Sequence, residues 1–379
     1  MVAACDGALV ALAANDGWNI VNYRAGLIRA LQAAGYRIAV LAPPGPHDQA
    51  IRDLGISFFP IPLAPRGRSP VADLRTFAAY LRTLRRLRPA ALLGFTAKPN
   101  IYGSLAAHWL GIPVVNNISG LGAVFASDGP LNRLVTGLYR LSLGRSAKVF
   151  FQNPDDRALF EARGVVRRGQ AGLLPGSGVD LERFAPRPRP AGDPFTFLFA
   201  ARLLWDKGLG EFVEAARRLR AQGTGARFQV LGMIEPASGA AVPRAALAQW
   251  ESEGILEYLG STDDVRGPFA AADCLVLPSY YREGTPRVLL EAAAMGIPSI
   301  TTDTPGCREA VDDGVTGMLC EPRSIDALVS SMERIIAMSA AQRSQLGKAA
   351  RAKMEREFRE ELVHRAYLEA LSQHALRGD

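Results

Sequence analysis

Short apolar runs alternate with stretches of helical periodicity along the first half of the chain. The periodic stretches often end in a glycine just before the next apolar run, as at Gly35 and Gly111, which is a common way for a helix to end. Continuous apolar strands separated by helices indicate a parallel sheet with helices on both faces. The runs that we predict as strands are Ala8–Ala13, Arg37–Ala42, Ile56–Ile61, Ala91–Phe95, Val114–Asn116, Val149–Gln152 and Gly172–Leu174. The helices predicted between them are Val21–Ala34, Val71–Leu87, Ile101–Leu110 and Asn132–Leu143.

The same alternation restarts after residues 184–194, a proline-rich stretch with the composition of a linker. We therefore predict two α/β domains, residues 1–185 and 186–358, followed by a helical tail over 359–379 that crosses back to the first domain. The strands predicted in the second domain are Phe195–Ala201, Phe228–Leu231, Leu256–Leu259, Cys274–Pro278 and Ser299–Thr302. The helices predicted there are Gly210–Ala221, Val265–Ala272, Pro286–Met295, Ile325–Met338 and Ala341–Phe358.

The composition fits a globular protein rather than a fibrous or membrane-spanning one. Apolar residues make up 48% and charged residues 21% of the 379 residues, which is ordinary for a folded soluble chain. The four cysteines form no CxxC pair, which argues against a disulfide framework or a zinc ribbon. No run of about 18 apolar residues is present, and the apolar start lacks a basic region before it. We expect a cytoplasmic protein with reduced thiols.

The charge is divided unevenly between the two predicted domains. The net charge of +7 is the average of a basic half, with 21 Lys+Arg against 11 Asp+Glu over residues 1–185, and a mildly acidic half, with 23 against 26. Nucleic acid, an anionic membrane and phosphorylated substrates are the partners to be weighed. No interleaving of aromatic and basic residues supports nucleic-acid binding, so we expect none.

The basic charge is concentrated between residues 66 and 98, with eight basic residues and one acidic residue, Asp73. Within it, residues 73–88 have leucines and a phenylalanine at helical spacing, surrounded by arginines. Two interpretations stay open: a helix packed on the core with a solvated basic face, or a helix that contacts anionic lipid. The excess of positive charge in the first domain favours contact with an anionic membrane, at the cytoplasmic leaflet.

The strongest local signal lies at residues 278–292, where a predicted strand is followed by a polar loop and a helix. We expect Thr285 to be the N-cap and Pro286 the first helical residue, which would aim free backbone amides toward the loop as an anion site. Glu283 would lie at the mouth of this site and Glu291 further along the helix. The spacing of these two glutamates alone is weak, since a solvated glutamate on a helix explains Glu291 equally well.

Two further loops follow predicted strands. Arg202 and Lys207 lie on a short strand-to-helix connection, and two cations there suit a negatively charged leaving group, although solvated surface cations are the alternative. Gly17 follows the first predicted strand and would let the backbone approach a phosphate. The segment lacks GxGxxG, so no dinucleotide fingerprint is present, and a simple turn explains a lone glycine as well.

Together, Arg202, Lys207, Glu283 and Glu291 in a second α/β domain resemble the retaining GT-B glycosyltransferases of family 4. Residues 175–180, 258–265 and 314–319 resemble further segments of that family, so the resemblance spans nearly the whole chain. The fold that it implies is α/β, a GT-B pair of Rossmann-like, doubly wound domains with an interdomain cleft. The first domain would be the acceptor side and face the membrane, and the second would bind the nucleotide-sugar donor.

The resemblance also implies roles for individual residues. Arg202 and Lys207 would bind the donor diphosphate and stabilise the leaving charge, and Glu283 would hold hydroxyls of the donor sugar. Glu291 would bind the ribose. The implied donor-binding set is Gly17, Gly284, Thr285, Pro286, Arg287, Val288 and Glu291.

A narrower resemblance concerns segments 96–104, 116–122 and 283–287, which are similar to the subgroup that extends glycans on undecaprenyl diphosphate, often with N-acetylhexosamine. It implies an acceptor side that includes Lys98, Asn100, Asn117 and Ser119, and a donor that is a UDP-sugar. The partners would be a nucleotide sugar, a lipid-linked or other glycan acceptor, and an anionic membrane surface. The alternatives are a nucleotide-sugar epimerase of GT-B shape and a non-catalytic sugar-binding protein.

The sequence departs from the family pattern at one point. Many members have a histidine near the donor sugar in the first domain, and no corresponding histidine is identified in this chain. His108 is predicted on a helix face, so no general base is identified. The resemblance implies that the leaving phosphate accepts the acceptor's proton, which needs no protein base. Asp263 and Asp264 are typical of a helix N-cap, so we expect no cofactor and no required metal.

Overall fold

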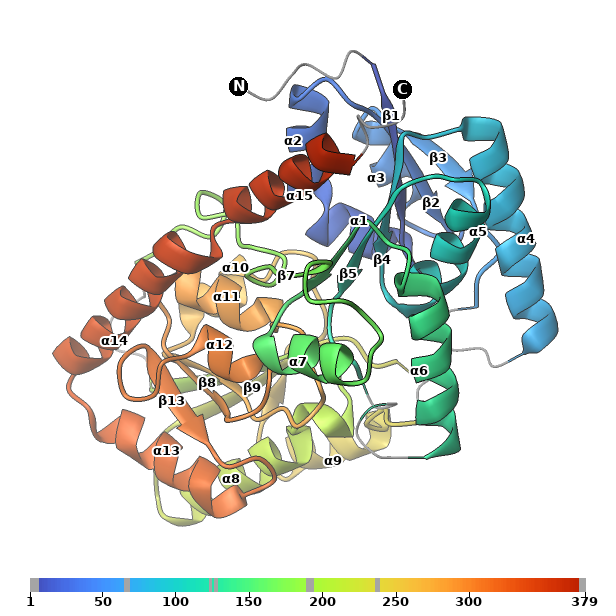
Figure 1. The fold of residues 1–379 in the computed structure, drawn as a ribbon. Helices are drawn as coiled ribbons and strands as arrows, with labels where there is room; N and C mark the ends of the chain where they lie inside the picture. Colours follow the sequence, from blue (N-terminus) through green and yellow to red (C-terminus); the bar gives the residue numbers. More distant parts are fainter. Residues whose placement is uncertain are drawn as a thin grey trace. The chain divides into compact units, whose positions relative to one another are not determined.

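The apolar runs of the first half form a seven-stranded parallel sheet with the order β3-β2-β1-β4-β5-β6-β7 in the computed structural model (Figure 1). The structure describes residues 7–64, 69–122, 125, 129–188, 194–235 and 239–374. The strands are β1 Leu9–Ala13, β2 Arg37–Ala42, β3 Ser57–Pro60, β4 Ala91–Phe95, β5 Val114–Ile118, β6 Lys148–Phe151 and β7 Ala171–Leu173. The helices are α1 Gly17–Tyr23, α2 Ala25–Ala33, α3 Asp48–Asp53, α4 Pro70–Leu87, the π-helix η1 Pro99–Gly103, α5 Ser104–Trp109, α6 Pro130–Leu143, α7 Pro154–Ala162 and α15 Glu360–His374.

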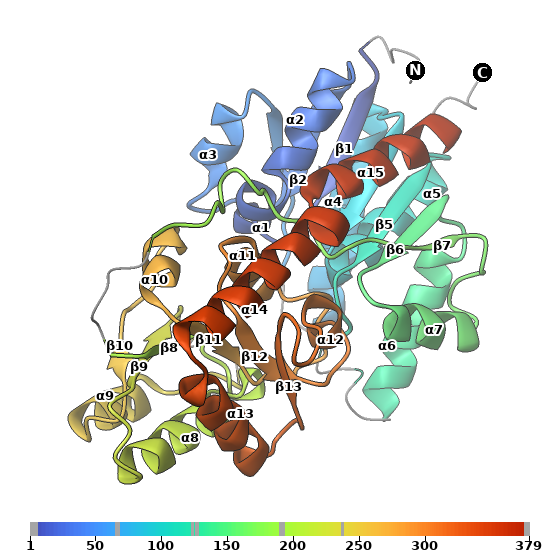
Figure 2. The ribbon, with the colours of Figure 1, turned by 90° about the vertical axis from the view of Figure 1, so that its left-hand side faces the viewer.

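Side chains of β1 alternate between two cores, as expected for a strand covered on both faces. Val10 and Leu12 join the core under α2 and α15, which lie side by side (Figure 2). The small side chains of Ala11 and Ala13 face the opposite core, formed with α4 and α5. Helices α6 and α7 continue the layer on this second face over β5 and β6.

The second half forms a six-stranded parallel sheet with the order β10-β9-β8-β11-β12-β13 and a single core. Its strands are β8 Thr196–Ala200, β9 Arg227–Leu231, β10 Glu257–Tyr258, β11 Cys274–Leu277, β12 Ser299–Thr302 and β13 Gly317–Cys320. Its helices are the 3₁₀ turn η3 Trp205–Lys207, α8 Leu209–Ala221, α9 Arg244–Ser252, α10 Arg266–Ala271, α11 Arg287–Ala294, α12 Cys307–Ala310, α13 Ile325–Ala337, α14 Ala340–Lys353 and the π-helix η4 Met354–Phe358.

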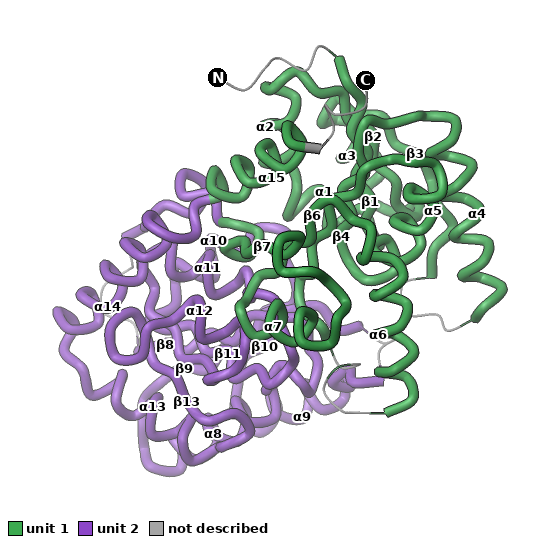
Figure 3. Tube along the Cα trace, in the orientation of Figure 1, with its two compact units in different colours: residues 1–178, 360–379 green, residues 179–359 purple. Residues whose placement is uncertain are grey.

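The chain divides into two compact units at positions that differ from the predicted domain boundary (Figure 3). Unit 1 comprises residues 1–178 and 360–379, and unit 2 comprises residues 179–359. The division precedes the predicted 185/186 because Val179 and Phe184 are buried in the core of unit 2. Part of the proline-rich stretch, residues 189–193, lies outside the described residues.

Both sheets reverse their strand order at one place, between β1 and β4 in unit 1 and between β8 and β11 in unit 2. Ligands of doubly wound sheets bind outside the carboxyl ends of the strands at this switch point. The loops that follow β1, β4, β8 and β11 are therefore the places to examine. No helix in the described part of the chain is long and apolar enough to cross a membrane.

Candidate functional site

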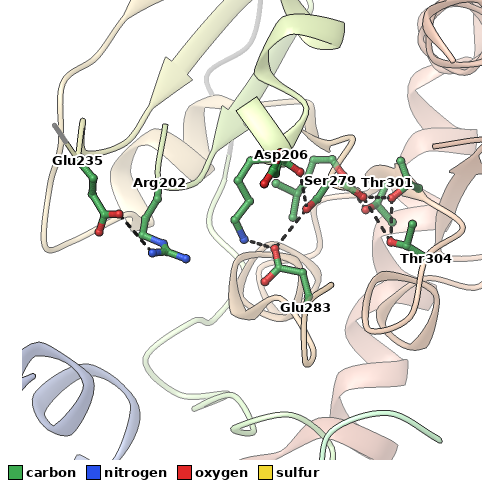
Figure 4. A network of polar contacts seen from close by, with 10 residues as sticks. Arg202, Asp206, Glu235, Ser279, Glu283, Thr301 and Thr304 are labelled. Atoms are coloured by element: carbon green, nitrogen blue, oxygen red, sulfur yellow. Dashed lines mark hydrogen bonds and ion pairs between the residues drawn. The ribbon is translucent and has the colours of Figure 1, made fainter. Parts of the chain in front are cut away.

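The switch point of unit 2 holds an ion pair between Lys207 and Glu283, which are 76 residues apart in the sequence. Lys207 ends η3 after β8, and Glu283 lies in the loop after β11. Their side chains are only 9% and 13% exposed, so both charges are largely removed from bulk water. Ser279 Oγ lies 3.3 Å from Glu283 Oε1 (Figure 4). The two residues that the sequence assigned to the donor site are thus brought into contact.

Backbone contacts explain why these two loops meet. The carbonyl of Asp206 accepts hydrogen bonds from the amides of Tyr280 and Tyr281, at 3.0 and 2.9 Å. Gly208 has φ = +81°, and a Cβ there would lie 2.2 Å from the carbonyl oxygen of Pro278, so only glycine permits this approach. The η3 turn is therefore fastened to the start of the loop after β11.

A second glycine holds the other end of the same loop. Gly306, with φ = +89°, precedes α12, and a Cβ there would lie 1.7 Å from the carbonyl oxygen of Gly284. The amide of Gly306 donates to Glu309 Oε2 at 2.5 Å. The loop that contains Glu283 is thus packed backbone to backbone at both ends, which limits how far its carboxylate can move.

Arg202 follows β8 and is more exposed than Lys207. Its Nη1 lies 3.3 Å from Glu235 Oε2, an ion pair in which the arginine side chain is 44% exposed (Figure 4). Burial, with an added contribution from Glu283, raises the pKa of the Tyr281 hydroxyl, while Arg202 opposes that rise. The ammonium of Lys207 lies 5.2 Å from the Tyr281 ring centroid, within cation–π range.

The helix after this loop begins later than predicted. α11 spans Arg287–Ala294 with Pro286 as its N-cap, and no side chain caps it, so the prediction of Thr285 as N-cap and Pro286 as first residue was wrong. Pro286 has an extended backbone with ψ = 116°, which places it outside the helix. Because proline lacks an N–H, only the amides of Thr285, Arg287 and Val288 in this stretch could donate to an anion.

Glu291 is paired within its own helix rather than with the loop. Arg287 Nε lies 2.7 Å from Glu291 Oε1, one turn away, and both side chains are largely buried. Burial raises the pKa of the Glu291 carboxyl, and Arg287 acts in the opposite direction. A ligand that approached Glu291 would meet an oriented carboxylate whose partner is already in place.

In unit 1, Gly17 is the first residue of α1, at the carboxyl end of β1. A Cβ on it would lie 3.1 Å from Ile51 and 3.2 Å from His47, so its small size is needed for packing against α3. Asp16 caps the helix, with its carboxylate accepting from the amide of Asn19 at 2.7 Å.

The carboxyl end of β4 contains an unusual backbone. Thr96 has φ = +69°, a strained value for a β-branched residue, and such strain is concentrated at functional sites. The π-helix η1 follows at once, which is also frequent at such sites. Lys98 lies between these two features and forms a 2.5 Å ion pair with Asp73 at the start of α4. Burial and a hydrogen bond to Asp73 raise the pKa of Tyr102 to about 12.

Asn100 and Asn117 lie in a buried polar network rather than on an open surface. Asn100 Nδ2 donates to the carbonyl of Asn117 at 2.8 Å, and its Oδ1 accepts from Asn116 Nδ2 at 2.9 Å. Asn117 Nδ2 donates to the hydroxyl of Tyr367 on α15 at 2.9 Å. Both asparagines are 1% exposed or less, while Ser119, just beyond β5, is exposed. The network therefore holds the end of β5 and the start of η1 from beneath.

Helix α4 packs into unit 1 as a core helix with a solvated basic face. Tyr80 and Leu84 are fully buried, whereas Arg82, Arg85 and Arg86 are exposed. The core packing is that of the first interpretation, and the exposed arginines form the basic face that both interpretations require. Arg66 and Arg68, part of the same basic stretch, lie outside the described residues.

His108 lies on α5, as predicted, and no described residue hydrogen bonds to either ring nitrogen. Burial, with a contribution from Arg145, lowers its pKa to about 4. Asp264 accepts from the amide of Arg266, the first residue of α10. Among the described residues, no group of three or more His, Cys, Asp or Glu side chains is arranged to hold a metal, and the three described cysteines are free thiols.

Three parts of the unit 2 site escaped the sequence reasoning. Glu235, the partner of Arg202, stands in a loop with no motif to mark it. Gly306 follows a proline, and Gly208 follows Lys207, so a search for glycines at strand-to-helix loops could have found both.

Comparison with known proteins gives two successive family matches. Residues 20–176 match a family described as "Glycosyl transferase 4-like domain", and residues 182–353 match "Glycosyl transferases group 1". Each match falls wholly within one unit, the first in unit 1 and the second in unit 2.

Two curated relatives match over most of their length. One is the N,N'-diacetylbacillosaminyl-diphospho-undecaprenol alpha-1,3-N-acetylgalactosaminyltransferase of Campylobacter jejuni, to which the chain is 26% identical over 337 residues. This alignment covers 84% of this chain and 87% of the relative. The chain is 24% identical over 308 residues to the UDP-Gal:alpha-D-GlcNAc-diphosphoundecaprenol alpha-1,3-galactosyltransferase of Escherichia coli, which covers 77% of each.

Among solved structures, HepE of Anabaena in complex with UDP and glucose superposes with a TM-score of 0.79. The superposition covers 97% of this chain and 100% of HepE at 17% identity, so what the two share is the fold. The pair of doubly wound units is therefore the GT-B architecture that the sequence predicted.

Proposed function

We propose that this chain, which belongs to the GT-B glycosyltransferases, moves a hexose or an N-acetylhexosamine from a UDP-sugar to a glycan carried on a polyprenyl diphosphate. Both curated relatives are named for transfer to undecaprenyl-diphosphate-linked sugars, and one is named for a UDP-sugar donor. Assembly of a cell-surface polysaccharide or glycan is the setting in which such an acceptor is used.

The observation that carries the proposal is the Lys207–Glu283 pair at the switch point of unit 2. A cation and a carboxylate held together there match the two ends of a donor at its reacting bond, the diphosphate and the sugar hydroxyls. Close backbone contacts restrict the movement of the loops after β8 and β11. Gly208 and Gly306 each allow such a contact, which a side chain would block.

In the proposed reaction, the bond between the anomeric carbon and the diphosphate breaks while the acceptor hydroxyl forms a new bond to that carbon. Lys207 and Arg202 stabilise the negative charge that develops on the leaving diphosphate. Glu283 accepts hydrogen bonds from hydroxyls of the donor sugar and fixes its orientation. The leaving phosphate oxygen takes the acceptor's proton, so the configuration is retained and no protein base is needed.

The remaining donor contacts are proposed from the helix and loop geometry. The amides of Thr285, Arg287 and Val288 lie at the start of α11, where the helix dipole favours a phosphate. Glu291 accepts hydrogen bonds from the ribose hydroxyls. Because two cations and these amides carry the phosphate charge, we propose that transfer needs no metal; activity that survives EDTA supports this, and activity restored by Mg²⁺ alone contradicts it.

On the acceptor side, we propose that Lys98 and Ser119 contact the lipid-linked glycan at the carboxyl ends of β4 and β5. Asn100 and Asn117 are buried, so their proposed role is to support this edge from beneath. We further propose that unit 1, whose sequence carries the positive charge, associates peripherally with the inner leaflet of the cytoplasmic membrane, where such an acceptor resides.

A screen of nucleotide sugars by thermal shift tests the donor assignment, because a bound donor stabilises the fold by mass action. We expect UDP-sugars to raise the melting temperature of the wild type, and Lys207→Ala to lose that shift, although its own unfolding temperature also falls because Glu283 is left largely buried without its partner. A rise with purine nucleotide sugars alone, or no rise with any of them, contradicts the proposed UDP-sugar donor.

A further inference from the structure

The outward side of α6 is divided lengthwise into an apolar and a basic part. At about 100° per residue, Tyr139, Ser142 and Leu143 define the buried side of this helix. On the same wheel, Leu134 and Leu141 fall together on one edge of the outward side. Arg133 and Arg140 fall together on the other edge.

The apolar edge is strongly exposed. Leu134 and Leu141 are 61% and 65% exposed, and Leu131 at the start of the helix is also exposed. Trp109 ends the neighbouring helix α5 and is 78% exposed, the largest value among the exposed apolar side chains of the described residues. We call Trp109, Leu131, Leu134 and Leu141 the apolar strip.

Trp109 belongs with this strip because the ends of α5 and α6 are neighbours. The two helices contact each other. Arg145, just beyond α6, is close enough to His108 to help lower its pKa. The last turn of α5 is therefore near the last turn of α6, where Leu141 lies.

The basic edge opens on a shallow hollow of about 520 Å³ between α6 and α7. Its lining residues are Asn132, Arg133, Thr136, Gly137, Arg140 and Arg163. Arg163 Nη1 donates to Asn132 Oδ1 at 2.8 Å, and Arg140 Nη2 donates to the carbonyl of Arg163 at 2.5 Å, so two of the three guanidinium groups are oriented. The lining contains no carboxylate, which makes the hollow suited to phosphate groups.

We propose that the outward side of α6, with Trp109, is the surface by which unit 1 lies on an anionic lipid bilayer. The apolar strip enters the boundary between headgroups and acyl chains, and the arginine-lined hollow receives lipid phosphates. This combination of Leu and Trp on one side and Arg on the other is what an interfacial helix uses. The inference rests on the proposed function only in that a lipid-linked acceptor gives unit 1 a reason to be at a membrane.

Charge and apolar exposure together favour a bilayer over a protein partner. Residues 1–185 carry a net charge of +10, which attracts anionic headgroups and repels a second copy of the same surface. Helix α4 also exposes two large apolar residues, Val71 and Leu74, but both lie in its first turns, whereas Arg82, Arg85 and Arg86 lie in its second half. The apolar and basic residues of α4 are therefore mostly separated along the helix, whereas on α6 they run side by side.

The test is flotation of the full-length protein with vesicles of phosphatidylcholine alone and of phosphatidylcholine mixed with phosphatidylglycerol. We expect the wild type to float with the anionic vesicles only. The double substitution Leu134→Ser/Leu141→Ser lowers the bound fraction at least about tenfold, since two exposed leucines no longer enter the bilayer. Arg133→Gln lowers the affinity about fivefold.

The matched control is Arg82→Gln/Arg85→Gln on α4, which should lower binding less than the leucine substitution. All variants are expected to unfold at the wild-type temperature, because the altered side chains are exposed. The inference is overturned if the leucine variant floats like the wild type, if the wild type binds neither vesicle, or if light scattering without lipid shows a dimer that the leucine variant abolishes.

A second measurement separates this inference from the proposed function. Transfer to an acceptor with a short, water-soluble prenyl chain should be the same in the wild type and the leucine variant. If neither the wild type nor any variant transfers sugar to an acceptor, while the wild type still floats with anionic vesicles in a way that depends on α6, the proposed function fails and the membrane surface stands. If transfer proceeds and flotation does not depend on α6, the membrane surface fails and the proposed function stands.

Discussion

The two switch points of this chain share one topology and differ in chemistry. In unit 2 the loops after β8 and β11 present charged pairs, with Lys207 against Glu283 and Arg202 against Glu235. In unit 1 the ends of β4 and β5 rest mainly on buried neutral amides, with Asn116 and Asn117 fully removed from water, and the Lys98–Asp73 ion pair there ties the end of β4 to α4. The same fold therefore supports one edge lined by paired charges and another held mainly by buried hydrogen bonds.

The difference follows from what each edge can tolerate. A buried neutral amide costs less than a buried charge, and most donors and acceptors of this network are paired, with Asn116 Oδ1 as an exception among the described residues, so the network can hold a loop in place. Separating a charged pair in a poorly hydrated loop is costly, because each charge is left without a partner. A ligand that carries charges of both signs or matching polar groups can take the place of the lost partner. Substitutions in unit 2 should therefore affect mainly turnover, and substitutions in unit 1 mainly stability and acceptor binding.

The largest expected effect is on turnover at the charged edge. Lys207→Ala removes a cation from the leaving diphosphate and should lower kcat by about 100- to 1,000-fold, the range found when one donor to a developing anion is removed. The matched control is Lys348→Ala, an exposed lysine on α14 of the same unit, which should leave kcat unchanged. Steady-state transfer assays measure both. A rate near that of the wild type for Lys207→Ala would contradict the assignment of the donor site.

The next effect is on stability at the neutral edge. Asn116 Nδ2 donates to Asn100 and to Ser104 Oγ at 2.8 Å, so Asn116→Leu leaves both acceptors without this donor. We expect a loss of about 1–3 kcal/mol in the free energy of unfolding, measured by urea denaturation. Asn22→Leu on α1 is the control, since its side chain bonds only in an exposed position. Equal losses in both variants would show that the buried network adds nothing.

A smaller effect is expected from one hydroxyl on α15. Tyr367→Phe removes the acceptor of the Asn117 side chain and should cost about 1 kcal/mol of stability. Because Asn117 supports the loop that we propose as the acceptor side, we expect the KM for acceptor to rise while the KM for donor stays the same. Tyr258→Phe, whose hydroxyl bonds to Gly232 in unit 2, is the matched control. A rise in donor KM with Tyr367→Phe would contradict the separation of the two edges.

The smallest effect concerns the pH dependence of stability. Burial lowers the pKa of His108 from 6.5 to about 4, so the unfolded chain binds this proton more readily than the folded one. Stability from this group is therefore present above pH 6.5 and lost as the pH falls toward 4. The melting temperature of His108→Gln should fall less over this interval than that of the wild type. Parallel curves for the two proteins would show that His108 is not protonated differently on unfolding.

Most strands could be predicted from the sequence because they are apolar runs with polar ends. β2, β4 and β12 have the predicted bounds, and the others that were predicted differ at their ends. β13, Gly317–Cys320, was not predicted as a strand, because it is only four residues long and most of it lies in segment 314–319, which was interpreted only by its family resemblance. Short helices were missed too, since α9 and α12 offer too few turns for a period to show.

One predicted helix, Val21–Ala34, is two in the structure, α1 and α2, joined at Arg24. Arg24 is 2% exposed, and its guanidinium lies 4.1 Å above the ring of Phe95. The sequence around Arg24 continues the helical spacing of apolar residues, so it does not reveal that one helix ends and another begins there. Its partner is 71 positions away, so only the folded sheet brings the two together.

The candidate site was partly predictable for the same kind of reason. Lys207 and Glu283 each lie in the connection that follows an apolar strand, and parallel strands place such connections at one edge of the sheet. Their contact depends on the backbone hydrogen bonds of Asp206 to the loop after β11, which no side-chain pattern encodes. The buried state of Asn100 and Asn117 was also out of reach, because asparagines are usually exposed.

The most direct test of the account follows the donor sugar in the presence and absence of a diphosphate-linked acceptor. We expect the wild type to consume the UDP-sugar and attach the sugar to the acceptor with its anomeric configuration retained, only when the acceptor is present. Glu283→Gln should abolish both consumption and product. Consumption without acceptor, with the sugar still on the nucleotide as an epimer, would show an epimerase and contradict the assignment of this chain as a transferase of lipid-linked glycans.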